Sequence, residues 1–123
     1  MNEIDTIQNQ NSKQIRPWGY YVNIAKGEGF LTKIIHVNSK EKLSVQSHNH
    51  RKEHWFIIKG TAKVLLNSET YTLNSGDSID IPIQAIHSIY NPLEDDLELI
   101  EIQMGKILSE KDIIRYEDIY GRV

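Results

Sequence analysis

The feature that most constrains the fold is a series of short runs rich in Val, Ile, Tyr and Thr, separated by polar turns. Runs of this length and composition are typical of β-strands rather than helices. The candidate strands are residues 20–25, 30–38, 43–48, 55–59, 62–66, 69–73, 78–81, 86–90 and 97–104. So many short strands at close spacing predict an all-β sandwich or barrel.

The turns between these runs contain residues suited to sharp changes of direction. Gly60, Asn67-Ser68 and Ser75-Gly76-Asp77 separate neighbouring strands. Gly and Asn tolerate positive φ, and Asp and Ser bond locally to the backbone. We therefore expect successive strands to be antiparallel.

The C-terminal stretch "SEKDIIRYEDIY" departs from the strand pattern. Ser109 is a suitable N-cap, Asp112 follows three residues later, and the apolar residues after it have mixed helical spacing. The sequence predicts one short C-terminal helix here.

The chain has 123 residues, which fits one domain large enough to bury a core without disulfides or a metal. Residues 1–14 are rich in Asn, Gln and Ser and are expected to form a loose arm. Residues 15–123 are expected to form a single domain.

Composition excludes several function classes. A net charge of −3 without any Lys or Arg run argues against nucleic acid as a partner. No apolar run has transmembrane length and the N-terminus lacks a leader-like apolar region, so we expect no membrane association and a cytoplasmic location. Because the chain has no Cys, any metal must bind through nitrogen and oxygen ligands.

The stretch "SHNHRKEHW", residues 47–55, holds three of the five histidines in the chain. Side chains alternate between the two faces of a strand, so His48 and His50 share one face if the strand extends that far. Two imidazoles on one face could bind a metal ion. The alternative is that they are exposed polar residues at the end of a strand.

A third ligand could be Glu53 or His54, which follow a tight turn expected at "RK". If Trp55 faces the interior, alternation also directs Glu53 inward and His54 outward, which favours Glu53. A fourth ligand must come from elsewhere, and His87 is a better candidate than His36, which we expect to be a packed or surface strand residue. Three His and one carboxylate suit a single divalent ion, with Zn our first expectation and Fe, Mn, Ni or Co also compatible.

Two segments together resemble the two motifs of the cupin superfamily, whose fold is a double-stranded β-helix or jelly-roll barrel. The first motif is matched by HxH at His48 and His50 and by E-x6-G at Glu53 and Gly60. The second, G-x5-P-x-G-x2-H-x3-N, is matched with Gln84 standing where the family usually has glycine. Its matching residues here are Gly76, Pro82, His87 and Asn91. The gap between the second His and the Glu is one residue shorter than usual, and Lys42 stands where a leading glycine is common.

A narrower resemblance covers almost everything after the arm. The stretches "RPWGYY", "HRKEHW" and "DIIRYEDIYGR" are similar to the cupin domain of type II mannose-6-phosphate isomerases, found at the C-terminus of bifunctional mannose-1-phosphate guanylyltransferases. Nothing in these 123 residues corresponds to the nucleotidyltransferase domain of those enzymes, so guanylyltransferase activity is not expected.

The resemblance implies a metal-dependent isomerase that interconverts mannose 6-phosphate and fructose 6-phosphate for nucleotide-sugar and polysaccharide synthesis. A divalent ion suits this chemistry because it can polarise the sugar oxygens and stabilise an enediolate. The alternatives are a metal-holding sugar-binding cupin without turnover, a nucleotide-sugar ketoisomerase or epimerase, and a dioxygenase.

The strand "LELIEIQ" supplies the first candidate for the base that moves the proton. If Glu101 and Gln103 face inward, they line a polar pocket beside the metal, with Glu101 as base and Gln103 as a substrate contact. If instead Ile100 and Ile102 face the core, this polar face is exposed. Gln46, on the HxH face, is a candidate partner for sugar hydroxyls, or a buried glutamine bonded to backbone.

A sugar phosphate also needs cationic partners, and Arg suits phosphate because its fork binds two oxygens. Arg16 and Arg115 are our candidates because they lie in family-like motifs, and Lys33 is a further one. Arg51 could instead brace the turn after the histidines. We expect a homodimer, since cupins of this kind commonly pair through outer sheet faces and "WFIIKGTAKVLL" is apolar on both faces.

Overall fold

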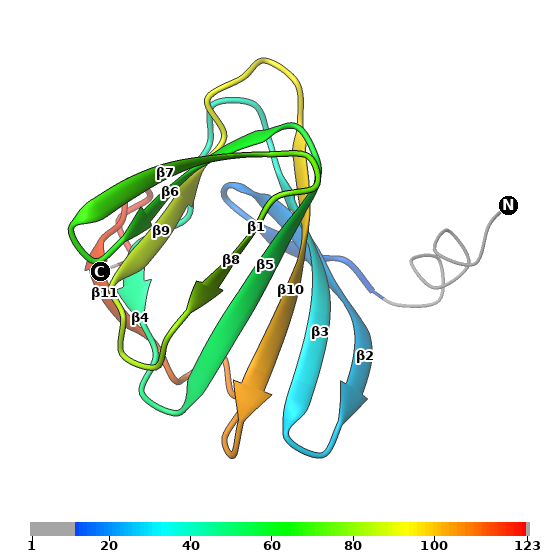
Figure 1. Cartoon of the computed structure of the whole chain (residues 1–123), viewed down its shortest axis with the longest axis vertical. Helices are drawn as coiled ribbons and strands as arrows, with labels where there is room; N and C mark the ends of the chain where they lie inside the picture. The colour runs from blue at the N-terminus through cyan, green and yellow to red at the C-terminus, as the bar shows by residue number, and fades with distance from the viewer. Residues whose placement is uncertain (1–11, 123) are drawn as a thin grey trace, which may run out of the picture.

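The computed structural model describes residues 12–122, which form two antiparallel β-sheets facing each other (Figure 1). The strands are β1 (Gln14–Arg16), β2 (Gly19–Gly27), β3 (Phe30–Val37), β4 (Val45–Ser47), β5 (Arg51–Lys59), β6 (Thr61–Leu66), β7 (Glu69–Asn74), β8 (Ser78–Ile81), β9 (His87–Tyr90), β10 (Leu97–Gly105) and β11 (Ile114–Glu117). The predicted all-β class is confirmed, and each predicted strand is present.

One sheet has the strand order β1-β2-β3-β10-β5-β8 and the other β11-β4-β9-β6-β7. Strands far apart in sequence become neighbours in both sheets: β10 lies between β3 and β5, and β9 lies between β4 and β6. The result is the barrel-like double-stranded arrangement expected from the motifs (Figure 1). The predicted arm lies mostly outside the described residues, and its last residue, Gln14, pairs with Tyr21 in β1 and β2.

Alternation along the strands forms the core between the sheets. In β5, Trp55 and Ile57 are buried, while Phe56 and Ile58 lie on the outer face. The apolar residues of β6 and β10 alternate in the same way, so both sheets direct an apolar row inward.

The first prediction concerns this core. Ile57 has no exposed surface and its neighbour Ile58 is 39% exposed. Ile57→Ala should therefore lower the free energy of unfolding by about 2–5 kcal/mol, through lost burial and the cavity left behind. The matched change Ile58→Ala should cost about 0.5 kcal/mol or less. Chemical denaturation of both variants measures the difference, and similar losses would contradict the assignment of faces.

Two turns need the left-handed backbone conformation. Gly60, between β5 and β6, has a φ of 93°, and a Cβ there would lie 3.1 Å from the main-chain oxygen of Asp96. Asn67, between β6 and β7, has a φ of 54°. Both positions use the residue types that tolerate positive φ, which explains why the sequence identified these turns correctly.

The predicted C-terminal helix is wrong. Residues 114–117 form β11, which pairs with β4 so that Arg115 lies opposite Gln46. Only a single turn forms before it, with Asp112 N donating to Ser109 O at 3.0 Å. The apolar residues of this stretch do not form one helical stripe, and pairing with a distant strand satisfies the backbone instead.

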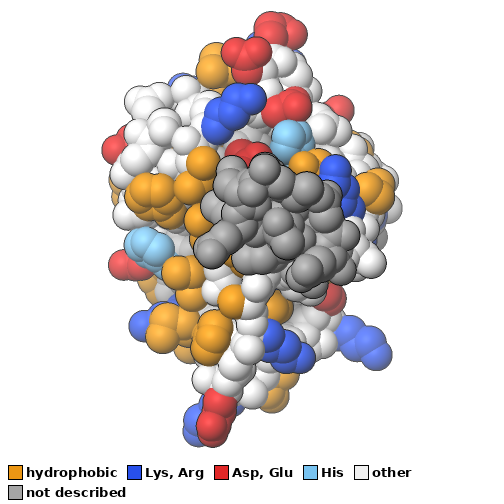
Figure 2. Space-filling view, turned by 90° about the vertical axis from the view of Figure 1, so that its right-hand side faces the viewer, with side chains coloured by type: hydrophobic (Ala, Val, Ile, Leu, Met, Phe, Trp, Pro, Cys, Tyr) orange, Lys and Arg blue, Asp and Glu red, His pale blue; other side chains and the backbone are white. Residues whose placement is uncertain are grey.

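The outer surface carries exposed apolar side chains among charged ones (Figure 2). Phe56 and Ile58 on β5 and Met104 on β10 are among them. This agrees with the apolar character on both faces of β5 seen in the sequence, and the dimer stays a prediction. Residues 12–122 contain no helix that is long and apolar enough to cross a membrane.

Candidate metal centre

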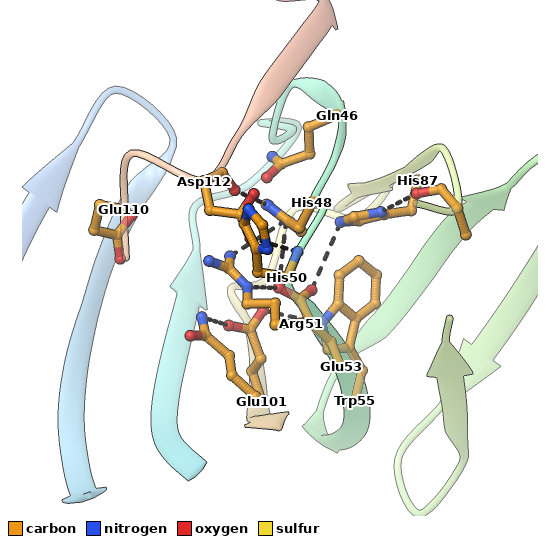
Figure 3. Close-up of polar contacts among 12 residues, drawn as sticks. Gln46, His48, His50, Arg51, Glu53, Trp55, His87, Glu101, Glu110 and Asp112 are labelled. Atoms are coloured by element: carbon orange, nitrogen blue, oxygen red, sulfur yellow. Dashed lines mark hydrogen bonds and ion pairs between the residues drawn. The ribbon is translucent and has the colours of Figure 1, made fainter. Parts of the chain in front are cut away.

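Three potential ligands converge inside the barrel: His48, Glu53 and His87 (Figure 3). All three are buried, and one ligand atom from each lies within 4.8 Å of the other two. The Nε2 atoms of His48 and His87 are 3.4 Å and 3.6 Å from the two carboxylate oxygens of Glu53. Two imidazoles and one carboxylate at such distances are a donor set for a divalent metal.

Strands of both sheets bring these residues together. Glu53 is on the inner face of β5, His87 is the first residue of β9, and His48 follows the last residue of β4. Gln84 N donates to the main-chain oxygen of His48 at 2.8 Å, which ties the loop before β9 to the end of β4. Gln84 has a φ of 67°, so the position where cupins usually have glycine uses a left-handed backbone here too.

Both imidazoles are oriented by main-chain oxygens. His48 Nδ1 donates to Asp112 O at 2.6 Å, and His87 Nδ1 donates to Ala85 O at 2.9 Å. A proton on Nδ1 places the lone pair of each ring on Nε2. Each ring therefore presents the correct nitrogen to the centre, as supporting hydrogen bonds do around metal-binding histidines.

The surroundings favour the neutral imidazoles that a metal requires. Burial lowers the pKa of His48 to about 4, and the positive charge of Arg51 adds to this effect. Burial also lowers the pKa of His87. Because a protonated imidazole cannot bind a metal, rings that remain neutral at pH 7 fit a divalent ion.

Arg51 lies directly against the cluster. Its Nε donates to Glu53 Oε2 at 2.9 Å, and its Nη2 lies 3.3 Å from His48 Nε2 (Figure 3). Arg51 and Lys52 belong to β5, so the tight turn expected at "RK" is wrong, and the chain turns at residues 49–50 instead. Arg51 is thus a buried partner of the ligands rather than a brace for a turn.

The other histidines lie outside the cluster. His50 is exposed because β4 ends at Ser47, and the alternation that would align it with His48 is interrupted. His54 is on the outer face, with Nδ1 2.6 Å from Asp80 Oδ1. His36 stacks on Tyr20 and lies 2.9 Å from Asp96. The structure brings together three of the four predicted ligands, and His50 as the fourth stays a prediction.

Asp112 fixes the position of the loop that follows β4, residues 48–50. Its carboxylate accepts hydrogen bonds from the main-chain N–H groups of Asn49 and His50, each at 2.9 Å, while its main-chain oxygen orients His48. These N–H bonds outweigh the opposing effect of burial and lower the pKa of Asp112. The carboxylate is therefore ionised at neutral pH, and it ties the loop after β4 to the segment that contains Asp112.

A second prediction follows from Asp112. Asp112→Ala removes the carboxylate that fixes the loop, so the His48 ring should lose its orientation and divalent metal should bind about tenfold or more weakly. Metal titration by calorimetry measures this, with Lys111→Ala as the adjacent control. Equal affinity in the two variants would show that the loop does not orient the ligand.

A polar row crosses three strands beside the cluster. Glu101 of β10 lies opposite Lys33 of β3 on one side and Trp55 of β5 on the other, and all three are buried. In the next row, Gln103 lies opposite Glu53. Glu101 and Gln103 thus face inward, whereas Ile100 and Ile102 are only partly buried on the other face.

Glu101 is held by two donors. Trp55 Nε1 donates to its Oε2 at 3.0 Å, and Gln103 Nε2 donates to its Oε1 at 2.7 Å. Burial, and after it the negative charge of Glu53, raises the pKa of Glu101. A carboxylate with a raised pKa can accept and return a proton near neutral pH, as a general base must.

The predicted substrate-binding residues converge on one pocket beside this row. Arg16, Lys33, Gln46 and Arg115 line it together with Glu53, His87 and Glu101. Gln103 is buried and contacts the pocket through its hydrogen bond to Glu101. The Nε2 of Gln46 donates to Ser44 Oγ at 3.0 Å.

Sequence reasoning missed two residues that contribute to the site, Glu110 and Asp112. Both belong to the loop between β10 and β11, and Glu110 contacts Lys33 and Tyr21 inside the pocket. Asn91 of the second motif has a structural role instead, donating to the main-chain oxygens of Val37, Asn38 and Asp95. No local pattern in "SEKDII" indicates that this loop lies against a pocket built by other strands.

Comparison with known proteins places this arrangement in a family. The family model described as "Mannose-6-phosphate isomerase C-terminal" matches residues 3–118. The mannose-1-phosphate guanylyltransferase ManC of Salmonella typhimurium is 48% identical over 108 residues, 88% of this chain and 22% of that protein. The alginate biosynthesis protein AlgA of Pseudomonas aeruginosa is 43% identical over 116 residues, 94% of this chain and 24% of that protein.

The chain thus spans about a quarter of the length of these curated relatives. Among solved structures, an RmlC-like cupin from Shewanella frigidimarina matches with a TM-score of 0.72 at 13% identity. The match covers 85% of this chain and 90% of that one. This likeness confirms the cupin fold.

Proposed function

The chain belongs to the family of mannose-6-phosphate isomerase C-terminal domains, and we propose that it is a metal-dependent isomerase that interconverts mannose 6-phosphate and fructose 6-phosphate. The observation that carries this proposal is the proximity of two functional groups in one pocket. Glu53 and His87 of the donor set line the same pocket as Glu101, a buried carboxylate with a raised pKa.

Aldose–ketose isomerisation moves one proton between C2 and C1 of the sugar and a second proton between the oxygens on these two carbons. A divalent ion bound by His48, Glu53 and His87 would supply positive charge where the carbonyl and hydroxyl oxygens gain negative charge. Glu101 takes the proton from one carbon and returns it to the other. Trp55 and Gln103 hold both of its oxygens in place, so the carboxylate is fixed before substrate binds.

The remaining pocket residues suit a phosphorylated sugar. Five cationic side chains and three carboxylates line the pocket, which leaves an excess of positive charge for a phosphate. Gln46 offers an amide to sugar hydroxyls. We propose that the reaction takes place in the cytoplasm and supplies nucleotide-sugar and polysaccharide synthesis. The name of the relative AlgA refers to alginate biosynthesis, and ManC is named as a mannose-1-phosphate guanylyltransferase.

A coupled assay tests this function. Purified protein loaded with Zn²⁺, Mn²⁺ or Co²⁺ should form fructose 6-phosphate from mannose 6-phosphate, and unphosphorylated mannose serves as the matched control. Nucleotide-linked sugars assayed in parallel test the ketoisomerase or epimerase alternative. Turnover of a nucleotide sugar without any turnover of mannose 6-phosphate would reject the proposal.

A further inference from the structure

The cations of the pocket differ in how they are neutralised. Arg51 pairs with Glu53, and Arg122 pairs with Asp118 in its own segment. Lys33 pairs with Glu110, which comes from the loop between β10 and β11. Within the part of the chain that the structure describes, Arg115 has a buried Nε with no hydrogen-bond partner.

Lys33 provides a buried positive charge in the pocket. Its side chain is 5% exposed, and its Nζ lies 4.0 Å from the centre of the Tyr21 ring. Arg16 adjoins it, because Arg16 Nη2 donates to the Tyr21 hydroxyl at 3.2 Å. A buried ammonium needs an anion beside it, since desolvation of an unpaired charge is costly.

Glu110 supplies that anion from the loop between β10 and β11. Its Oε1 accepts hydrogen bonds from Lys33 Nζ and from the Tyr21 hydroxyl, while 59% of its side-chain surface is exposed. Burial of the carboxyl group opposes ionisation, but the charge and hydrogen bond of Lys33 outweigh it and lower the pKa of Glu110. Unlike Lys33, Glu110 is on a loop and can leave the pocket without breaking the core.

The pocket has little free room with Glu110 in place. The free space inside it is about 70 Å³, enough for a few water molecules. A phosphate that binds Lys33 therefore competes with Glu110 for the space beside its ammonium group. Glu110 is the exposed one among the three carboxylates, since Glu53 and Glu101 are buried in the barrel.

We propose that Lys33, Arg16 and the Tyr21 hydroxyl form an anion subsite, and that Glu110 is a built-in counter-anion that the phosphate group of the substrate displaces. A phosphate dianion carries more charge and more acceptor oxygens than a carboxylate, so it competes well for the same donors. Arg115, on β11 of the same C-terminal segment, adds a donor that is unused before the phosphate arrives. This inference rests on the proposed function for its substrate class but not for its test.

Glu110→Gln keeps the size of the side chain and removes its charge, so inorganic phosphate should bind about tenfold more tightly than to the wild type. The matched control is Glu69→Gln, an exposed carboxylate on β7 that changes the net charge by the same amount. Lys33→Met should abolish phosphate binding. Calorimetric titration of the full chain with inorganic phosphate measures all three.

The inference is overturned if Glu110→Gln binds phosphate no more tightly than Glu69→Gln, or if Lys33→Met binds it as well as the wild type. Because phosphate binding needs no turnover, this result is independent of the isomerase assay. Tighter phosphate binding by Glu110→Gln without any isomerisation would support the subsite and reject the proposed reaction. Isomerisation by the wild type without tighter phosphate binding by Glu110→Gln would support the proposed reaction and reject the subsite.

Discussion

His87→Ala is expected to weaken divalent metal binding by more than about 100-fold. His87 provides one of only three donor atoms that the described structure brings together, and its Nε2 points at Glu53 from the opposite sheet. Without it, the remaining His48 and Glu53 lie near each other at one end of the same sequence motif and cannot surround an ion. Calorimetric titration with Zn²⁺ or Co²⁺ and the metal content of the purified protein measure the loss.

The matched control is His54→Ala. His54 is a histidine of the same cluster in sequence, but it lies on the outer face beside Asp80. Its replacement should leave the metal affinity unchanged. Thermal unfolding of both variants separates lost affinity from lost structure, because the apolar core does not include either histidine. Metal binding at wild-type strength in His87→Ala would refute the proposed donor set.

Glu101→Gln is expected to lower kcat for isomerisation by about 100- to 10,000-fold, the contribution of a well-positioned general base. The amide has nearly the same shape as the carboxylate and can still accept from Trp55 Nε1, so the pocket should keep its form. Metal affinity should stay within a small factor of the wild type, because Glu101 is not one of the three ligands.

The control for this variant is Glu98→Gln. Glu98 is on the same strand, β10, but on its other face near His36. It should keep full activity. A rate for Glu101→Gln equal to that for Glu98→Gln, with metal bound in both, would exclude Glu101 as the group that moves the proton.

The parts of the fold that the sequence predicts well are those set by alternation and turn chemistry. In residues 55–59 alternation predicted the inner face of β5, whereas in β10 it left both faces open, and the structure places Glu101 and Gln103 inward. The strand β11 was missed because it is a four-residue edge strand whose partner, β4, lies far away in sequence. A local pattern holds no information on that pairing.

The residues of the site also divide into those that strand alternation predicts and those that it does not. Alternation directs Glu53 inward together with Trp55, and it directs His54 outward, as the structure has them. The shared face of His48 and His50 depended on a strand that extends to residue 50, and β4 ends at Ser47, so alternation does not apply to His50. Glu110 and Asp112 act from a loop that reaches the pocket across the barrel, so only the folded chain reveals them.

The central claim is that the metal centre and Glu101 together isomerise a sugar phosphate. The most direct test is to remove divalent ions from the protein, add back metal in steps, and measure fructose 6-phosphate formed from mannose 6-phosphate. We expect no product without metal and a rate that rises with bound metal up to one ion per chain. Full occupancy of the site without product, or an undiminished rate in metal-free protein, would contradict the claim.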